Sequence, residues 1–122
     1  MFDALRNLDA WRRGCRLSVS VLALLDGCAN RTFKDQLARS SLSVASNVAE
    51  GYAREGTKDR IRLLVIAKGS CTECWTQLLI GAEAGLVDRD MALELAKEAE
   101  EIAAMIAGLI NFFQRHAGQS AA

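Results

Sequence analysis

Proline is absent from the sequence, histidine occurs once, and cysteine occurs four times in 122 residues. The sequence also has no run of about 18 or more apolar residues, so it predicts no transmembrane helix. No basic stretch followed by an apolar segment marks a signal peptide, and four cysteines are too few for a secreted disulfide scaffold. We therefore expect a cytoplasmic protein formed by a single domain over 1–122.

The scarcity of histidine and the spacing of cysteine argue against an enzyme. His116 is the only histidine, which excludes a di-iron bundle built on Glu-x-x-His pairs and most acid–base schemes. Cys71 and Cys74 form the sequence CTEC, but no second pair completes a zinc site and no helix start is predicted beside them. We expect a non-enzymatic protein without metal or cofactor, in which both cysteines lie in the core. A redox or metal sensor that uses them is the alternative.

What the sequence does contain is apolar residues that recur at intervals of three and four, which is typical of helices. Short breaks divide this pattern into four predicted helices, at about 9–26, 32–54, 58–84 and 88–115, followed by a frayed tail at 117–122. Connections of only a few residues favour antiparallel neighbours. The sequence thus predicts an all-α, antiparallel up-down-up-down four-helix bundle.

Helix ends are predicted from glycine and from capping residues. Gly27 and Gly85 are expected to end the first and third helices. Thr32, Thr57 and Asp88 are expected to cap the starts of the second, third and fourth helices.

The predicted helices differ in how many apolar faces they carry. The helix at 88–115 has one apolar stripe, formed by Met91, Leu95, Ala99, Ile102, Ile106, Leu109 and Phe113. The helix at 9–26 has two nearly opposite stripes, one formed by Leu8, Trp11, Cys15, Val19 and Leu22, the other by Ala10, Gly14, Leu17, Val21 and Leu24. Because two apolar faces need two partners, we expect the chain to assemble as a homo-oligomer.

The helix at 32–54 carries a polar stripe opposite its apolar side. This stripe is either a solvated face or a contact with another helix. In the second case Asn47 and Glu50 supply directional hydrogen bonds, and small Ser43 and Gly51 permit close approach. A glycine inside a helix, such as Gly51 or Gly69, costs about 1 kcal/mol relative to alanine, which also indicates close packing.

Charge is unevenly distributed although the formal net charge is zero. An antiparallel bundle would bring together the start of its first helix, the turn between its second and third helices, and the end of its fourth. The basic residues expected at that end are Arg12, Arg13, Arg16, Arg54, Lys58, Arg60, Arg62 and Arg115. We expect this end to bind phosphates of RNA or DNA. The alternative is that these residues pair with nearby carboxylates and only aid solubility.

Three segments of the sequence carry a family resemblance. NLDAWRRG at 7–14, ARSSLSVASNVAEGYAREGTKD at 38–59 and AKGSCTECWTQL at 67–78 resemble the signature of small four-helix-bundle proteins encoded by intervening sequences in bacterial large-subunit ribosomal RNA genes. The resemblance implies a homopentameric ring. The family's polar positions would be Ser46, Asn47, Glu50, Gly51, Gly69, Ser70 and Glu73. A related branch is the accessory variability protein of diversity-generating retroelements, so the resemblance also implies nucleic acid and a reverse transcriptase as partners.

Together these observations predict a homo-oligomeric helical bundle that binds RNA or DNA through a basic end. The alternatives are an adaptor that binds only proteins and an accessory protein of a reverse transcriptase. The predicted interface or structural polar network consists of Ser43, Ser46, Asn47, Glu50, Gly51, Gly69, Ser70 and Glu73.

Overall fold

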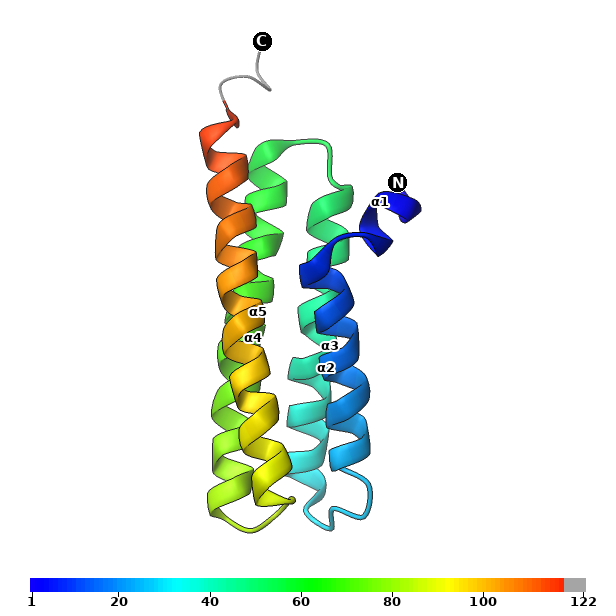
Figure 1. The fold of residues 1–122 in the computed structure, drawn as a ribbon, viewed down its shortest axis with the longest axis vertical. Coiled ribbons are helices and arrows are strands. Elements are labelled where there is room, and N and C mark those ends of the chain that lie inside the picture. Colours follow the sequence, from blue (N-terminus) through cyan, green and yellow to red (C-terminus); the bar gives the residue numbers. More distant parts are fainter. Residues whose placement is uncertain (118–122) are drawn as a thin grey trace.

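The computed structural model describes residues 1–117 of the chain. Helices in this part are α1 (Phe2–Arg6), α2 (Asp9–Leu24), α3 (Arg31–Ala53), α4 (Thr57–Glu83) and α5 (Arg89–Arg115). Helices α2 to α5 run alternately down and up as a four-helix bundle, and short α1 lies to one side near its upper end (Figure 1). This confirms the predicted all-α bundle. The tail predicted to fray lies outside the described residues beyond position 117.

Two glycines end helices as predicted. Gly27 has a φ of +80° and Gly85 a φ of +71°, a backbone conformation that glycine adopts without steric cost. The side chain of Asp88 accepts a hydrogen bond of 2.9 Å from the backbone N–H of Met91, which confirms it as the cap of α5.

Two predicted caps were wrong by one or two residues. Asn30 caps α3, because its side chain accepts a hydrogen bond of 3.0 Å from the N–H of Phe33. Thr32 is therefore already inside the helix. Gly56 is the cap residue of α4 and Thr57 its first residue, with no side chain capping that end. Asparagine caps a helix at least as well as threonine, so the residue types gave no reason to start α3 after Thr32 and not after Asn30.

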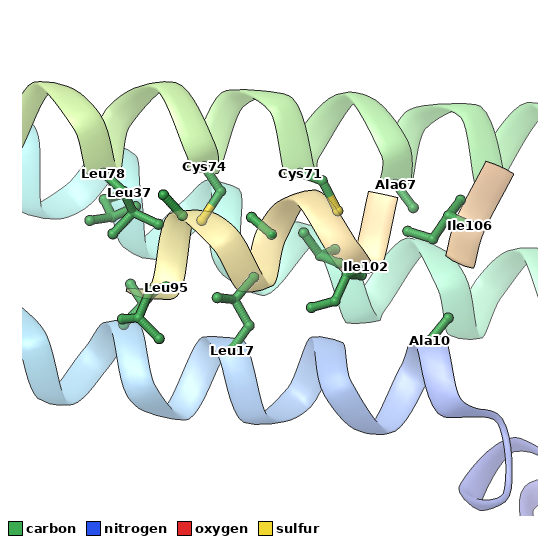
Figure 2. Close-up of a cluster of buried hydrophobic side chains, with 14 of the residues drawn as sticks. Ala10, Leu17, Leu37, Ala67, Cys71, Cys74, Leu78, Leu95, Ile102 and Ile106 are labelled. Atoms are coloured by element: carbon green, nitrogen blue, oxygen red, sulfur yellow. The ribbon is translucent and has the colours of Figure 1, made fainter. Parts of the chain in front are cut away.

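The core lies between all four long helices. Figure 2 shows Leu17 of α2, Cys71 and Cys74 of α4 and Ile102 of α5 directed into this shared interior. Burial raises the pKa of Cys71 to about 12 and that of Cys74 to about 11, so both thiols stay protonated near neutral pH. The two cysteines are core residues, as predicted.

One member of the predicted α5 stripe is misplaced. Met91 is 44% exposed, and Ala92 is buried in the first turn instead. Both residues lie within one turn of buried Leu95, at the i−4 and i−3 positions, so periodicity alone did not distinguish them.

Helix α2 is much shorter than its neighbours, and this shapes one end of the bundle. Its 16 residues span about 24 Å, whereas the 27 residues of α4 and of α5 each span about 40 Å. Figure 1 shows α2 starting below the upper end, where α3 meets α4 and where α5 ends. We call this end, formed by residues 51–62 and 109–116, the open end. None of the helices described is both long and apolar enough to cross a membrane.

Candidate nucleic-acid interface

Arg13 does not belong to the open end. Its Nε donates to Oε1 of Glu98 at 2.7 Å, and its Nη2 donates to Oε2 of Glu98 at 2.6 Å and to Oε1 of Glu101 at 3.1 Å. These hydrogen bonds raise the pKa of Arg13 and lower the pKa of Glu98. Glu98 lies about 25 Å from Arg115 along the axis of α5. Arg13 therefore joins α2 to the middle of α5. The prediction that Arg13 lies at the basic end was wrong, because α2 begins below the level of the open end.

The other two cations of α2 also lie along the side of the bundle. Arg12 pairs with Asp9 one turn earlier on the exposed surface. Arg16 lines a groove of about 460 Å³ between α2 and α5, together with Glu94 and Glu98. These two arginines of α2 thus lie near carboxylates on the side of the bundle. The prediction that Arg12 and Arg16 add to the positive charge of the open end was therefore wrong.

The α3–α4 turn supplies the cations of the open end. Within the described residues, Arg54 and Lys58 have no hydrogen-bond or ion-pair partner for their side chains, and Glu55 is the carboxylate between them. The Nε of Arg60 donates to the backbone oxygen of Arg54, and its guanidinium lies 5.0 Å from the ring centre of Phe113. This turn therefore presents positive charge that its own carboxylates do not neutralise.

Arg62 behaves differently from its neighbours in the turn. Its Nε lies 3.7 Å from a carboxylate oxygen of Asp59, and both side chains are mostly exposed. An exposed pair at this distance contributes little to stability. The predicted residue Arg62 is thus partly neutralised by Asp59.

Part of the predicted polar network joins α3 to α4 within one chain. The hydroxyl oxygens of Ser43 and Ser70 lie 2.7 Å apart, and Nδ2 of Asn47 donates to both the backbone oxygen and Oγ of Ser43 at 2.9 Å. At Gly51, an added Cβ would lie 3.2 Å from the backbone oxygen of Arg60. These residues let α3 and α4 approach closely and fix their relative position.

The rest of that network is exposed. The side chains of Ser46 and Glu50 in α3 and of Glu73 in α4 have no hydrogen-bond partner within residues 1–117, and Gly69 of α4 is exposed. Apart from its chain neighbours and the nearby backbone of α4, no atom of the described residues lies within 4 Å of the position that a Cβ at Gly69 would occupy. Packing within the chain therefore does not require glycine at this position.

Exposed apolar residues occur on two sides of the bundle. The first, the α2–α3 groove, has a volume of about 410 Å³ and is lined by Trp11, Cys15, Ser18, Val19, Leu22, Leu42, Ala45, Ser46 and Ala49. Val19 in this groove is 67% exposed. The second, which we call the α4 stripe, is interrupted: exposed Val65 and Ile66 are separated from exposed Ile80 by about four helical turns that also carry polar residues. The two predicted apolar faces of the first long helix thus separate into a buried face and an exposed one.

The open end also holds residues that the sequence analysis did not identify as a site. Tyr52, Leu109, Phe112 and Phe113 line a pocket there together with Arg60. They are accessible because α2 does not reach this level. The signal was present in the predicted lengths of the first and fourth helices, which differ by several turns.

Comparison with protein families agrees with this fold. The family model described as 23S rRNA-intervening sequence protein matches residues 6–108, which include all three segments that carry the resemblance. The chain belongs to this family. In this 23S rRNA-intervening sequence protein, the residues that bring α3 and α4 together lie inside the matched region. We call this contact, formed by Ser43, Asn47, Gly51 and Ser70, the α3–α4 seam.

A solved structure shares the fold of this family member. The crystal structure of a protein of unknown function from the S23 ribosomal protein family of Bacteroides thetaiotaomicron VPI-5482 matches with a TM-score of 0.77 and 18% sequence identity. The match covers 83% of this chain and 97% of that one. A search of curated proteins gives no match.

Proposed function

We propose that this 23S rRNA-intervening sequence protein is a non-enzymatic homo-oligomer that binds RNA or DNA through its open end. The observation that carries the proposal is the group of cations at the α3–α4 turn, where Arg54, Lys58 and Arg60 have no carboxylate partner within residues 1–117. Lysine and arginine side chains that are not neutralised by the protein displace counterions from nucleic-acid phosphates, which drives binding.

The opposite end of the bundle supplies a useful contrast. Its α2–α3 turn leads into exposed Arg31 and Lys34, while its α4–α5 turn leads into exposed Asp88 and Asp90. Positive charge beside one turn is thus offset by negative charge beside the other at this end. Phosphate binding is therefore expected at the open end and not at this one.

Self-assembly is supported by the two exposed apolar surfaces. The α2–α3 groove and the α4 stripe lie on different helices, so a contact between them would join unlike surfaces of two copies. Contacts of this head-to-tail type close into rings when the rotation between copies permits. The family resemblance implies five copies, and each copy would contribute one open end to the assembly.

The test is a titration of duplex DNA and of structured RNA with purified, nucleic-acid-free protein at low and near-physiological salt. The variant Arg54→Glu/Lys58→Glu is compared with Arg31→Glu/Lys34→Glu, which reverses the same residue types at the opposite end. We expect the first variant to weaken binding at least tenfold. Its dependence on salt should also fall, by about 0.9 in log–log slope for each lost contact with a duplex phosphate. The second variant should bind as the wild type does.

Two results would count against the proposal. Equal losses in both variants would mean that overall charge, and not the open end, governs binding. An absence of binding even at low salt would favour the alternative of an adaptor that binds only proteins.

A further inference from the structure

The shortness of α2 leaves a pocket at the open end. It has a volume of about 390 Å³ and is lined by Met1, Ala4, Leu8, Tyr52, Arg60, Leu109, Phe112 and Phe113. Ligand pockets in proteins commonly measure about 300 to 1,000 Å³, so a single aromatic ring system fits here. Ala4 of α1 and Met1, which precedes this helix, also line the pocket.

Contacts between rings hold the aromatic side of the pocket in place. The rings of Phe112 and Phe113 meet edge to face, with centres 5.4 Å apart. The ring of His116 lies 4.2 Å from that of Phe112, centre to centre. Phe112 nevertheless remains 47% exposed. A preformed apolar surface is thus available to a flat partner.

Arg60 makes the pocket unsuitable for a purely apolar occupant. Its guanidinium is held over Phe113 and uses Nε to bind the backbone of Arg54, but the terminal nitrogens have no acceptor within residues 1–117. An apolar side chain that filled the pocket would remove water from these donors without replacing their hydrogen bonds, which is unfavourable. The occupant should combine a flat ring with hydrogen-bond acceptors.

Charge at the open end narrows the chemistry of the occupant further. Arg54 lies in the α3–α4 turn, where its backbone oxygen accepts from Arg60, and Lys58 lies in the first turn of α4; neither side chain has a carboxylate partner within residues 1–117. A nucleotide within a single strand has these properties, because its base is a flat ring with polar edges and a phosphate lies on each side of it. Bases in a duplex are already stacked and paired, so only an unpaired base can enter.

We propose that this pocket receives one unpaired base of a single-stranded nucleic acid, with the base against Phe112 and Phe113 and the flanking phosphates near Arg54 and Lys58. The inference rests on the proposed function, because it names the form of nucleic acid that the open end recognises. Arg60 then donates hydrogen bonds to the base edge or to a phosphate.

The test uses two single strands of equal charge, each about 12 nucleotides long. One is oligodeoxythymidine, and the other is a deoxyribose-phosphate strand in which every position is abasic. Affinities are measured by fluorescence anisotropy for the wild type, for Phe112→Ala and for Phe112→Tyr. The matched control is Phe2→Ala, which removes a phenylalanine that is 76% exposed and does not line the pocket.

We expect the wild type to prefer the thymidine strand by about tenfold, as stacking of one base would give. Phe112→Ala should lose this preference while keeping its affinity for the abasic strand, since the phosphate contacts remain. Phe112→Tyr should keep the preference because its ring still stacks, and Phe2→Ala should behave as the wild type does. If Phe112→Ala fails to fold, Phe112→Leu provides apolar bulk without a ring.

The outcomes separate this inference from the proposed function. If the wild type binds both strands equally, the pocket does not receive a base, although the open end still binds phosphates. If it binds neither strand, the inference fails, and the titration with duplex DNA and structured RNA decides the proposed function separately. If Phe112→Ala lowers the mass of the assembly in solution, the pocket is a contact between subunits or with another protein, and the inference is overturned.

Discussion

Replacement of Gly51 by alanine offers a direct test of the α3–α4 seam. The new Cβ would lie 3.2 Å from the backbone oxygen of Arg60 and 3.2 Å from Cβ of Leu63. Carbon atoms pack best at about 3.5 to 4.0 Å, and neither neighbour is the end of a flexible side chain, so α4 must shift. Such overpacking costs about 1 to 3 kcal/mol, whereas alanine gains about 1 kcal/mol in helix propensity. We expect Gly51→Ala to reduce the free energy of unfolding by about 1 kcal/mol.

Gly108→Ala is the matched control, because Gly108 is exposed in α5 and, apart from its chain neighbours and the nearby backbone of α5, no atom of residues 1–117 lies within 4 Å of its added Cβ. This variant should gain about 1 kcal/mol from helix propensity alone. Urea-induced unfolding is followed by circular dichroism at one fixed protein concentration, since assembly stabilises the folded state by mass action. The two midpoints should move in opposite directions. If Gly51→Ala raised the midpoint as far as Gly108→Ala does, the seam would not require glycine and the packing argument would be refuted.

Two further predictions concern the α2–α5 ion pair and assembly. Glu98→Gln should destabilise the protein by about 1 kcal/mol at pH 7. The folded pKa of Glu98 is lowered, so its contribution is complete above its unfolded pKa of about 4.3 and is lost as pH falls through the folded value. Urea unfolding at pH 7 and pH 3 checks this, and a pH-independent difference would contradict it. Val19→Glu in the α2–α3 groove should lower the mass measured by light scattering, whereas Leu93→Glu, at an exposed leucine of α5, should not; an unchanged mass for Val19→Glu would exclude the groove as a subunit contact.

Local signals in the sequence were sufficient for most of the fold. Apolar periodicity located the four long helices, and the stops at Gly27 and Gly85 and the cap at Asp88 follow from chemistry that acts within a few residues. The same reasoning missed α1, whose five residues are too few to show a period. It placed the cap of α3 at Thr32 instead of Asn30; both residue types cap well, so residue type alone did not identify the correct one.

The candidate site was harder to predict from the sequence than the fold, because it depends on where each helix begins and ends along the axis of the bundle. Spacing placed Arg13 on α2 but could not show that Glu98 of α5 lies opposite it. Spacing also grouped Ser43, Asn47 and Gly51 without indicating whether their partner is α4 or another copy. The pocket beside Phe112 arises from a difference in helix length, which no single helical pattern contains.

Under the proposed function, assembly and binding would use different parts of this molecule. The α2–α3 groove and the α4 stripe lie on the sides of the bundle, whereas the cations of the α3–α4 turn lie at one end. Copies that pack through their sides around a rotation axis keep their helices roughly alongside one another. Cyclic symmetry then points every open end in the same direction. Under the proposed ring, several modest phosphate sites would therefore face one surface, and a strand that reaches two of them would gain affinity from effective concentration without any new contact. A small bundle of zero net charge would in this way bind a polyanion, because cations outnumber carboxylates at the open end of each copy and symmetry would repeat that excess.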